Sequence, residues 1–221
     1  MIKQSTYDDL KKIASCHRKA FPKSYSSKLG QVYCEKMLEW FISNKNNFLF
    51  HIEKEEQCIG YLGGVTINDY KSAGPSAAMM RYSFNRAIQS LIFRPWLIFH
   101  PEIFKNFSYL KTNIFKKIGL IKVYNSKENT IKVNPYAGLL VIGVDPKYHK
   151  KGYGSILQKE FERKANEMNF STLELSVKAQ NKGAIRSYER NGWEILRASE
   201  NHIRMVKNIE LSKLSENLEN G

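Results

Sequence analysis

The most constraining feature of the sequence is the uninterrupted apolar run YAGLLVIGV at residues 136–144. Nine residues are too few to cross a membrane as a helix, and the run is bounded by Asn134 and Pro135 before it and by Asp145 after it. Such a run is typical of a strand that is buried on both faces, as in sheets covered by helices. We therefore predict an α/β fold in which 136–144 is an inner strand of a central sheet.

The rest of the chain alternates helical and strand patterns around this run. Thr6 is a predicted helix N-cap, because Asp8 and Asp9 follow it and favour the first turn of a helix. Gly63 and Gly64 predict a bulge in their strand. The predicted strands are 1–5, 47–53, 57–68, 172–177, 193–198 and 202–207, and the predicted helices are 6–20, 27–43, 152–168 and 182–191.

Residues 69–133 interrupt this regular order. They contain two further predicted helices, at 77–93 and 101–118, and they are both aromatic and basic. Between Asp69 and Lys132 there are eleven Lys and Arg residues against three acidic residues. Because the α/β pattern resumes after 133, we interpret this stretch as an insertion in one domain that spans 1–207, followed by a frayed polar tail at 208–221.

The composition restricts the class of protein. A net charge of +14 favours anionic partners. The sequence has no run of 18 apolar residues and no apolar segment near its start, so we expect a cytoplasmic protein. Cys16, Cys34 and Cys58 lack the spacing of a zinc site or a disulfide framework, and we expect small buried side chains and no metal.

The residues after the apolar run predict a phosphate site. The sequence DPKYHKKGYG at 145–154 places a loop between a buried strand and a helix, and helix N-termini bind phosphate through free N–H groups. Gly152 and Gly154 allow a ligand to approach the backbone, and Lys147, Lys150 and Lys151 add positive charge. The spacing excludes both a P-loop and a dinucleotide-binding glycine motif.

A second motif, NKGAIRSYERNGW at 181–193, makes the predicted function more specific. With the first, it resembles the acyl-CoA-binding core of the GNAT superfamily of N-acetyltransferases, whose motifs are [Q/R]xxGxG/A and N-x-x-A-x-x-x-Y-x-x-x-G-[F/W]. The second motif matches at every marked position, and the first departs once, at His149. The resemblance implies a mixed central sheet flanked by helices, with a helical insertion before the CoA-binding strand.

The resemblance also implies roles for individual residues, with acetyl-CoA as co-substrate and no metal. The amide of Ile142 would stabilise the oxyanion, Asn181 would bind the pantetheine arm, and Tyr188 would protonate the departing thiolate. The implied catalytic residues are thus Tyr188 and Ile142. The implied acyl-CoA-binding set is Ile142, Val144, His149, Lys150, Lys151, Gly152, Tyr153, Gly154, Ser155, Asn181, Ala184 and Tyr188.

Structural roles stay open for several of these residues. Tyr188 also suits a core position, Asn181 a helix N-cap, and Gly192 the end of a helix. The three lysines also suit a solvated surface. No residue stands out as the base that deprotonates the acceptor amine, and the candidates are Glu174, His51, His100 and Glu53.

The sequence gives less information about the amine that would accept the acetyl group. The stretch HRKAFP at 17–22, followed by Gly30, resembles GNAT proteins of bacterial polysaccharide-biosynthesis clusters. This likeness implies a nucleotide-linked or lipid-linked amino sugar, whose phosphates would suit the basic insertion, which we interpret as a flap beside the acceptor. Alternatives are acetylation of proteins or polyamines, and a non-catalytic CoA- or nucleic-acid-binding module. Membrane contact through 77–118 is a further alternative, and we do not expect nucleic acid as a partner.

Overall fold

The computed structural model describes residues 1–68, 74–100 and 134–211. Its centre is a seven-stranded sheet with the order β1-β2-β3-β4-β5-β7-β6. Every neighbouring pair is antiparallel except β4 and β5, which are parallel. The strands are β1 (Ile2–Gln4), β2 (Asn47–Lys54), β3 (Gln57–Ile67), β4 (Tyr136–Val144), β5 (Thr172–Lys178), β6 (Glu194–Ala198) and β7 (His202–Asn208).

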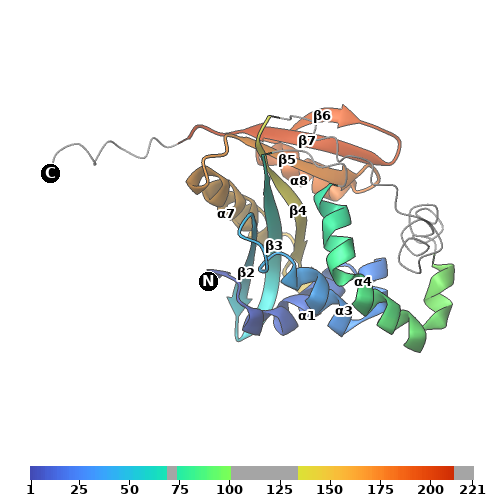
Figure 1. Cartoon of the computed structure of the whole chain (residues 1–221). Coiled ribbons are helices and arrows are strands. Elements are labelled where there is room, and N and C mark those ends of the chain that lie inside the picture. Colours follow the sequence, from blue (N-terminus) through green and yellow to red (C-terminus); the bar gives the residue numbers. More distant parts are fainter. Residues whose placement is uncertain (69–73, 101–133, 212–221) are drawn as a thin grey trace.

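Helices cover both faces of the sheet. Figure 1 shows α1, α3 and α4 on one side of strands β2–β4 and α7 on the other side. Strands β5–β7 run at a steep angle to strands β2–β4. The helices are η1 (Tyr7–Asp9), α1 (Leu10–Ala20), α2 (Tyr25–Leu29), α3 (Gln31–Glu39), α4 (Pro75–Phe93), η2 (Pro95–Phe99), η3 (Pro146–Tyr148), α7 (Tyr153–Glu167) and α8 (Lys182–Arg190). This is the predicted fold class, a mixed sheet flanked by helices.

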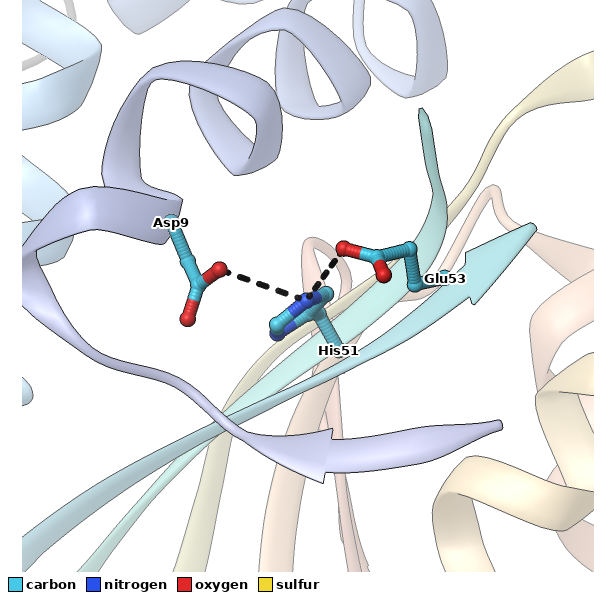
Figure 2. Close-up of side chains that lie close together, drawn as sticks. All are labelled: Asp9, His51 and Glu53. Atoms are coloured by element: carbon cyan, nitrogen blue, oxygen red, sulfur yellow. Dashed lines mark ion pairs between the residues drawn. The ribbon is translucent and has the colours of Figure 1, made fainter. Parts of the chain in front are cut away.

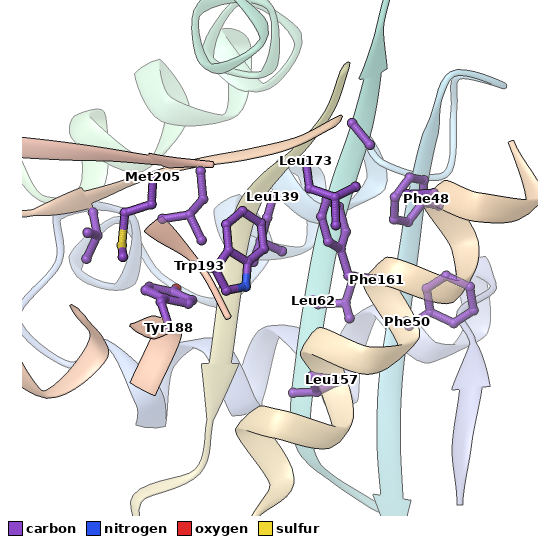
Figure 3. Packing of buried hydrophobic residues seen from close by; sticks show 14 of the residues in the cluster. Phe48, Phe50, Leu62, Leu139, Leu157, Phe161, Leu173, Tyr188, Trp193 and Met205 are labelled. Atoms are coloured by element: carbon purple, nitrogen blue, oxygen red, sulfur yellow. The ribbon is translucent and has the colours of Figure 1, made fainter. Parts of the chain in front are cut away.

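The two faces of the sheet bury two separate cores because side chains alternate along β3. Leu62 lies in the core beneath α7 and α8, where Phe161 and Trp193 stack at 6.3 Å (Figure 3). Tyr61, one residue earlier, lies in the opposite core with α1 and α3. An inner strand of this kind needs apolar residues on both faces, as the sequence predicts for 136–144.

Most predicted boundaries are confirmed. The hairpin of β2 and β3 turns at Glu55 and Glu56, which both have positive φ. The register between β3 and β4 shifts between Gly63 and Gly64, which confirms the predicted bulge. At the N-terminus, the Thr6 amide donates to Asp9 Oδ2 at 2.8 Å, as in a capping box.

The single helix predicted for 27–43 is wrong. The chain forms α2 and α3 instead, and they meet at Gly30, whose φ is +102°. The guanidinium of Arg94 lies 2.9 Å from the place that a Gly30 Cβ would occupy, and it also donates to Leu29 O at 2.8 Å. Arg94 is far away in sequence, so local periodicity could not reveal the break.

Part of the predicted insertion is described. Helix α4 packs through Tyr82 on the same core as α3, and Leu97 of η2 is buried there. Phe93, Trp96 and Phe99 are exposed. The second helix predicted for 101–118 lies outside the described residues. Within the described parts of the chain, no helix is long and apolar enough to span a membrane.

Candidate functional site

Strand β4 separates from β5 halfway along its length. The paired residues of β4 and β5 end at Leu139, which faces Leu175, while β4 continues to Val144. The paired half of β4 is buried, whereas Leu140 to Ile142 are only partly buried. The bulge lies at this point, because Leu139 and Val141 face the consecutive glycines of β3 and leave Leu140 extra. The sheet is therefore open on one side of the last five residues of β4.

The amides of Ile142 and Val144 face this opening. The amide of Asp145 donates to Ile59 O on β3 at 2.9 Å. Because the N–H groups of a strand alternate between its two edges, the amide of Gly143 also faces β3, and those of Ile142 and Val144 face the β5 side. The structure thus offers two backbone donors that no strand pairs within the described residues, at the two positions that the sequence predicts.

The loop after β4 has backbone angles that are typical of an anion-binding array of amides. Lys150 has φ of +59° and Gly152 has φ of +82°, and alternating backbone conformations of this kind turn successive N–H groups toward one point. Helix α7 then starts at Tyr153 with no side-chain cap. An added Cβ at Gly152 or at Gly154 would meet nothing within 4 Å. The first amides of α7 are therefore free to bind an anion in open space.

The side chains of Tyr148, Lys151 and Tyr153 lie close together in this loop and at the start of α7. Lys151 is exposed and its ammonium lies 5.4 Å from the ring centroid of Tyr148. The Tyr153 ring contacts Tyr148 edge-on at 6.0 Å and packs on the core, while Ser155 is partly buried in the first turn. Tyr153 therefore contributes mainly its backbone to the site.

His149 occupies the position where the resemblance places Gln or Arg. Its Nε2 lies 2.9 Å from Val144 O. The carbonyl of a strand residue points to the same side as its N–H, so this contact holds the imidazole at the mouth of the opening. The substitution thus leaves a hydrogen-bonding side chain at the rim.

Helix α8 brings the second motif to the same core. The Asn181 side chain accepts a hydrogen bond from the Ala184 amide at 3.2 Å, so its predicted role as an N-cap is confirmed. That bond uses the oxygen and leaves the amide nitrogen of Asn181, which is exposed, as a donor. Ala184 is partly buried against the core.

Tyr188 lies on the inner face of α8. It is 8% exposed and contacts Trp193 edge-on, with 6.1 Å between the ring centroids (Figure 3). Burial raises the pKa of Tyr188 to about 12. Its hydroxyl is thus protonated at neutral pH, which is the state that a proton donor requires.

Sequence reasoning missed the residues on the opposite face of β4. A Cβ at Gly143 would lie 2.8 Å from the Tyr61 ring, 2.9 Å from the Phe21 ring and 3.2 Å from Ala20 Cβ. The end of α1 therefore covers β4 between the two open amides. A glycine inside a buried strand is the available signal, because it marks a close approach.

The candidate bases do not converge on the opening. Glu174 lies on β5 opposite Gly138 and binds Arg204, whose Nε is 2.8 Å away. His51 and Glu53 lie on β2 toward the edge of the sheet (Figure 2). His100 follows η2, with its ring 5.4 Å from that of Tyr25. None of these four positions gives a reason to assign the base.

The cluster in Figure 2 is an ion-pair network. His51 Nε2 lies 3.7 Å from Asp9 Oδ1 and 3.7 Å from Glu53 Oε2. The ammonium of Lys12 contacts the same two oxygens, at 2.8 Å from Asp9 Oδ1. The hydrogen bonds from the ammonium groups of Lys12 and Lys3 lower the pKa of Glu53 to about 2. A carboxylate with so low a pKa is a weak base.

Comparison with known proteins gives a family for part of the chain and relatives for the fold. Residues 107–193 match the family model described as acetyltransferase (GNAT) family. Over this stretch the chain is similar to GNAT acetyltransferases. It is an acyltransferase, and acetyl-CoA is the expected co-substrate of this family. No curated protein sequence matches the chain.

Solved structures show the same fold at low sequence identity. The PaiA N-acetyltransferase of Thermoplasma acidophilum, crystallised with coenzyme A, is 14% identical with a TM-score of 0.54, covering 95% of this chain and 98% of that one. The ribosomal-protein-S18-alanine N-acetyltransferase of Escherichia coli is 16% identical with a TM-score of 0.52, covering 99% and 97%. An aminoglycoside 6′-N-acetyltransferase of Acinetobacter haemolyticus is 11% identical with a TM-score of 0.54, covering 98% and 99%.

The residues present fit coenzyme A. The open space at Gly152 and Gly154, before an uncapped helix, suits a pyrophosphate. The amides of Ile142 and Val144 suit a thioester carbonyl and an amide-bearing pantetheine arm. The two sets of donors adjoin, because the loop follows β4 directly.

Proposed function

We propose that this GNAT domain transfers the acetyl group of acetyl-CoA to the primary amine of a small, phosphate-bearing acceptor, with amino sugars as the acceptor class. The observation that supports acetyl transfer most strongly is the pair of open amides at Ile142 and Val144, which directly precede the amide array at Lys150–Ser155.

In this proposal the backbone binds and polarises the co-substrate. The amide of Ile142 donates to the thioester carbonyl, and the same bond strengthens as negative charge develops on that oxygen. Val144 and Asn181 hold the pantetheine arm. The amides from Lys150 to Ser155 hold the pyrophosphate, and acetyl-CoA supplies the activated acetyl group.

When the neutral acceptor amine adds to the thioester carbon and the C–S bond breaks, Tyr188 donates a proton to the departing sulfur, and the new amide nitrogen releases a proton to water. The raised pKa of Tyr188 keeps the hydroxyl protonated at neutral pH. The hydroxyl therefore gives up its proton only when the basic thiolate forms beside it. The Tyr188 ring is held by Trp193, so little side-chain entropy is lost in orienting the hydroxyl.

The charge near α1 and α2 supports an anionic acceptor. Lys23 and Lys28 are exposed on the segment that follows Phe21, whose ring lies over Gly143. Helix α4 contacts α2, and no acidic residue occurs between residues 74 and 100. A basic rim of this kind attracts phosphate and disfavours lysine-rich proteins as acceptors.

The proposal is tested by acetyl-CoA turnover with matched acceptors. Free thiol release is followed with glucosamine 1-phosphate, glucosamine, kanamycin, spermidine and an alanine-terminated peptide, and products are identified by mass spectrometry. We expect kcat/KM for glucosamine 1-phosphate to exceed that for glucosamine by about tenfold or more at low salt, and the difference to shrink as salt is added. Preference for the peptide or for the cationic amines would refute the acceptor class.

A further inference from the structure

A chain of hydrogen bonds, buried at Tyr61 and His17 and partly buried beyond them, links β3 to the segment between the end of α1 and the first turn of α2. His17 is 4% exposed, and both of its ring nitrogens have hydroxyl partners: Nδ1 contacts Tyr61 Oη, and Nε2 lies 2.8 Å from Ser26 Oγ. Ser26 Oγ is 3.0 Å from Ser24 Oγ, which donates to Phe21 O at 2.9 Å. The chain therefore runs from the interior of the sheet to the segment 21–26.

The direction of these bonds follows from burial. Burial lowers the pKa of His17 to about 4, so the imidazole is neutral at physiological pH, with one donor and one acceptor nitrogen. Burial also raises the pKa of Tyr61, which is fully buried and keeps its proton. A buried O–H needs an acceptor, so Tyr61 donates to Nδ1, and the N–H at Nε2 donates to Ser26.

The segment held by this chain lies beside the open amides. Tyr61 and Phe21 both press on Gly143, which is flanked by Ile142 and Val144. The segment 21–26 is on the α1 face of β4, whereas the amide array leads into α7 on the other face. With the co-substrate entering from the α7 side, the α1 side is where the acceptor amine can reach the thioester.

We propose that His17 is a positioning residue for the acceptor: through Tyr61 and Ser26 it fixes the segment 21–26 as the wall that orients the acceptor amine. This inference rests on the proposed acetyl transfer. It assigns a role to a histidine that lies too deep to touch either substrate. It also explains why both ring nitrogens have hydroxyl partners, and why each group in the chain donates its hydrogen bond in the same direction, from Tyr61 toward Phe21.

The test compares Tyr61→Phe, which removes only the hydroxyl, with His17→Phe and His17→Gln. Amide hydrogen exchange is measured by NMR on the full chain without an acceptor, and steady-state kinetics are measured with acetyl-CoA and glucosamine 1-phosphate. Ile13→Val is the matched control, because Ile13 is fully buried in the same helix but lies outside the hydrogen-bond chain.

We expect Tyr61→Phe and His17→Phe to speed exchange of the amides at 21–27 about tenfold, with no change in α7. The KM for glucosamine 1-phosphate should rise about tenfold, while kcat and the KM for acetyl-CoA stay within about twofold. His17→Gln, whose amide can donate to Ser26, should recover part of the loss.

Unchanged exchange at 21–27 would overturn the inference, as would equal losses for both substrates or an Ile13→Val variant that behaves like Tyr61→Phe. The proposed function fails separately. If the unaltered enzyme acetylates none of the amines, the acceptor class is refuted, and the exchange rates alone decide whether His17 holds the segment.

Discussion

The amide of Asp145 donates to the carbonyl of Ile59 at 2.9 Å, and this bond gives the direction of the amides from Ile142 to Val144, which follow the bulge on β4. Had the register been one residue different, Gly143 would face the opening and Ile142 would be paired with β3. The bulge at Leu140 and the end of β5 pairing at Leu139 then leave the donors of Ile142 and Val144 open. Backbone register, more than any side chain, creates this site.

Gly154→Val should strongly weaken the binding of acetyl-CoA without unfolding the protein. The new side chain would extend into open space before the first amides of α7, where the pyrophosphate must approach. We expect the Kd from calorimetry to rise about a hundredfold, or by about 2.7 kcal/mol. Lys150→Ala is the control, and it should cost less than about 1 kcal/mol because an exposed lysine is screened. A more severe loss for Lys150→Ala would contradict the backbone account.

Tyr188→Phe should lower kcat about 10²–10⁴-fold while the Kd for acetyl-CoA changes little. The phenyl ring keeps the packing on Trp193, and only the proton donor is lost. Single-turnover measurements will isolate the chemical step. If the single-turnover rate is unchanged, Tyr188 is a packing residue.

Gly143→Ala should destabilise the fold by about 1–3 kcal/mol, because the added methyl would lie too close to the rings of Tyr61 and Phe21. Gly138→Ala is the matched control on the same strand, where the nearest atom to the new Cβ is 3.4 Å away. Urea unfolding will compare the two. Equal stabilities for the two variants would show that the end of α1 is not packed on β4 as described.

The buried His17 should make stability depend on pH. Its pKa falls from 6.5 in the unfolded chain to about 4 in the fold, so between these values the unfolded state binds more protons. The stabilisation is complete above about pH 6.5 and declines as the pH falls toward 4. Between about pH 7.5 and 4.5 the native protein should lose about 2–3 kcal/mol more than His17→Gln, measured by urea unfolding. Parallel pH profiles would contradict a neutral, buried imidazole.

The local parts of this architecture could be predicted from the sequence, and the long-range parts could not. The bounds of β4 follow from its apolar run, and the glycines of β3 mark the bulge. The break at Gly30 depends on Arg94, so it leaves no periodic signal. His17 does fall at helical spacing with Leu10 and Ile13. Its partners Tyr61 and Ser26, however, meet it only in the folded protein. The proposed acceptor wall rests on the contact between Phe21 and Gly143, which could not be predicted because the two residues meet only in the folded protein.

The most direct test of the central claim is residue-resolved amide exchange with and without saturating coenzyme A. We predict added protection at Ile142 and Val144 and across Lys150–Ser155, with little change at Gly143, whose amide already faces β3. Protection confined to other segments, or equal protection at Gly143 and its two neighbours, would contradict the account.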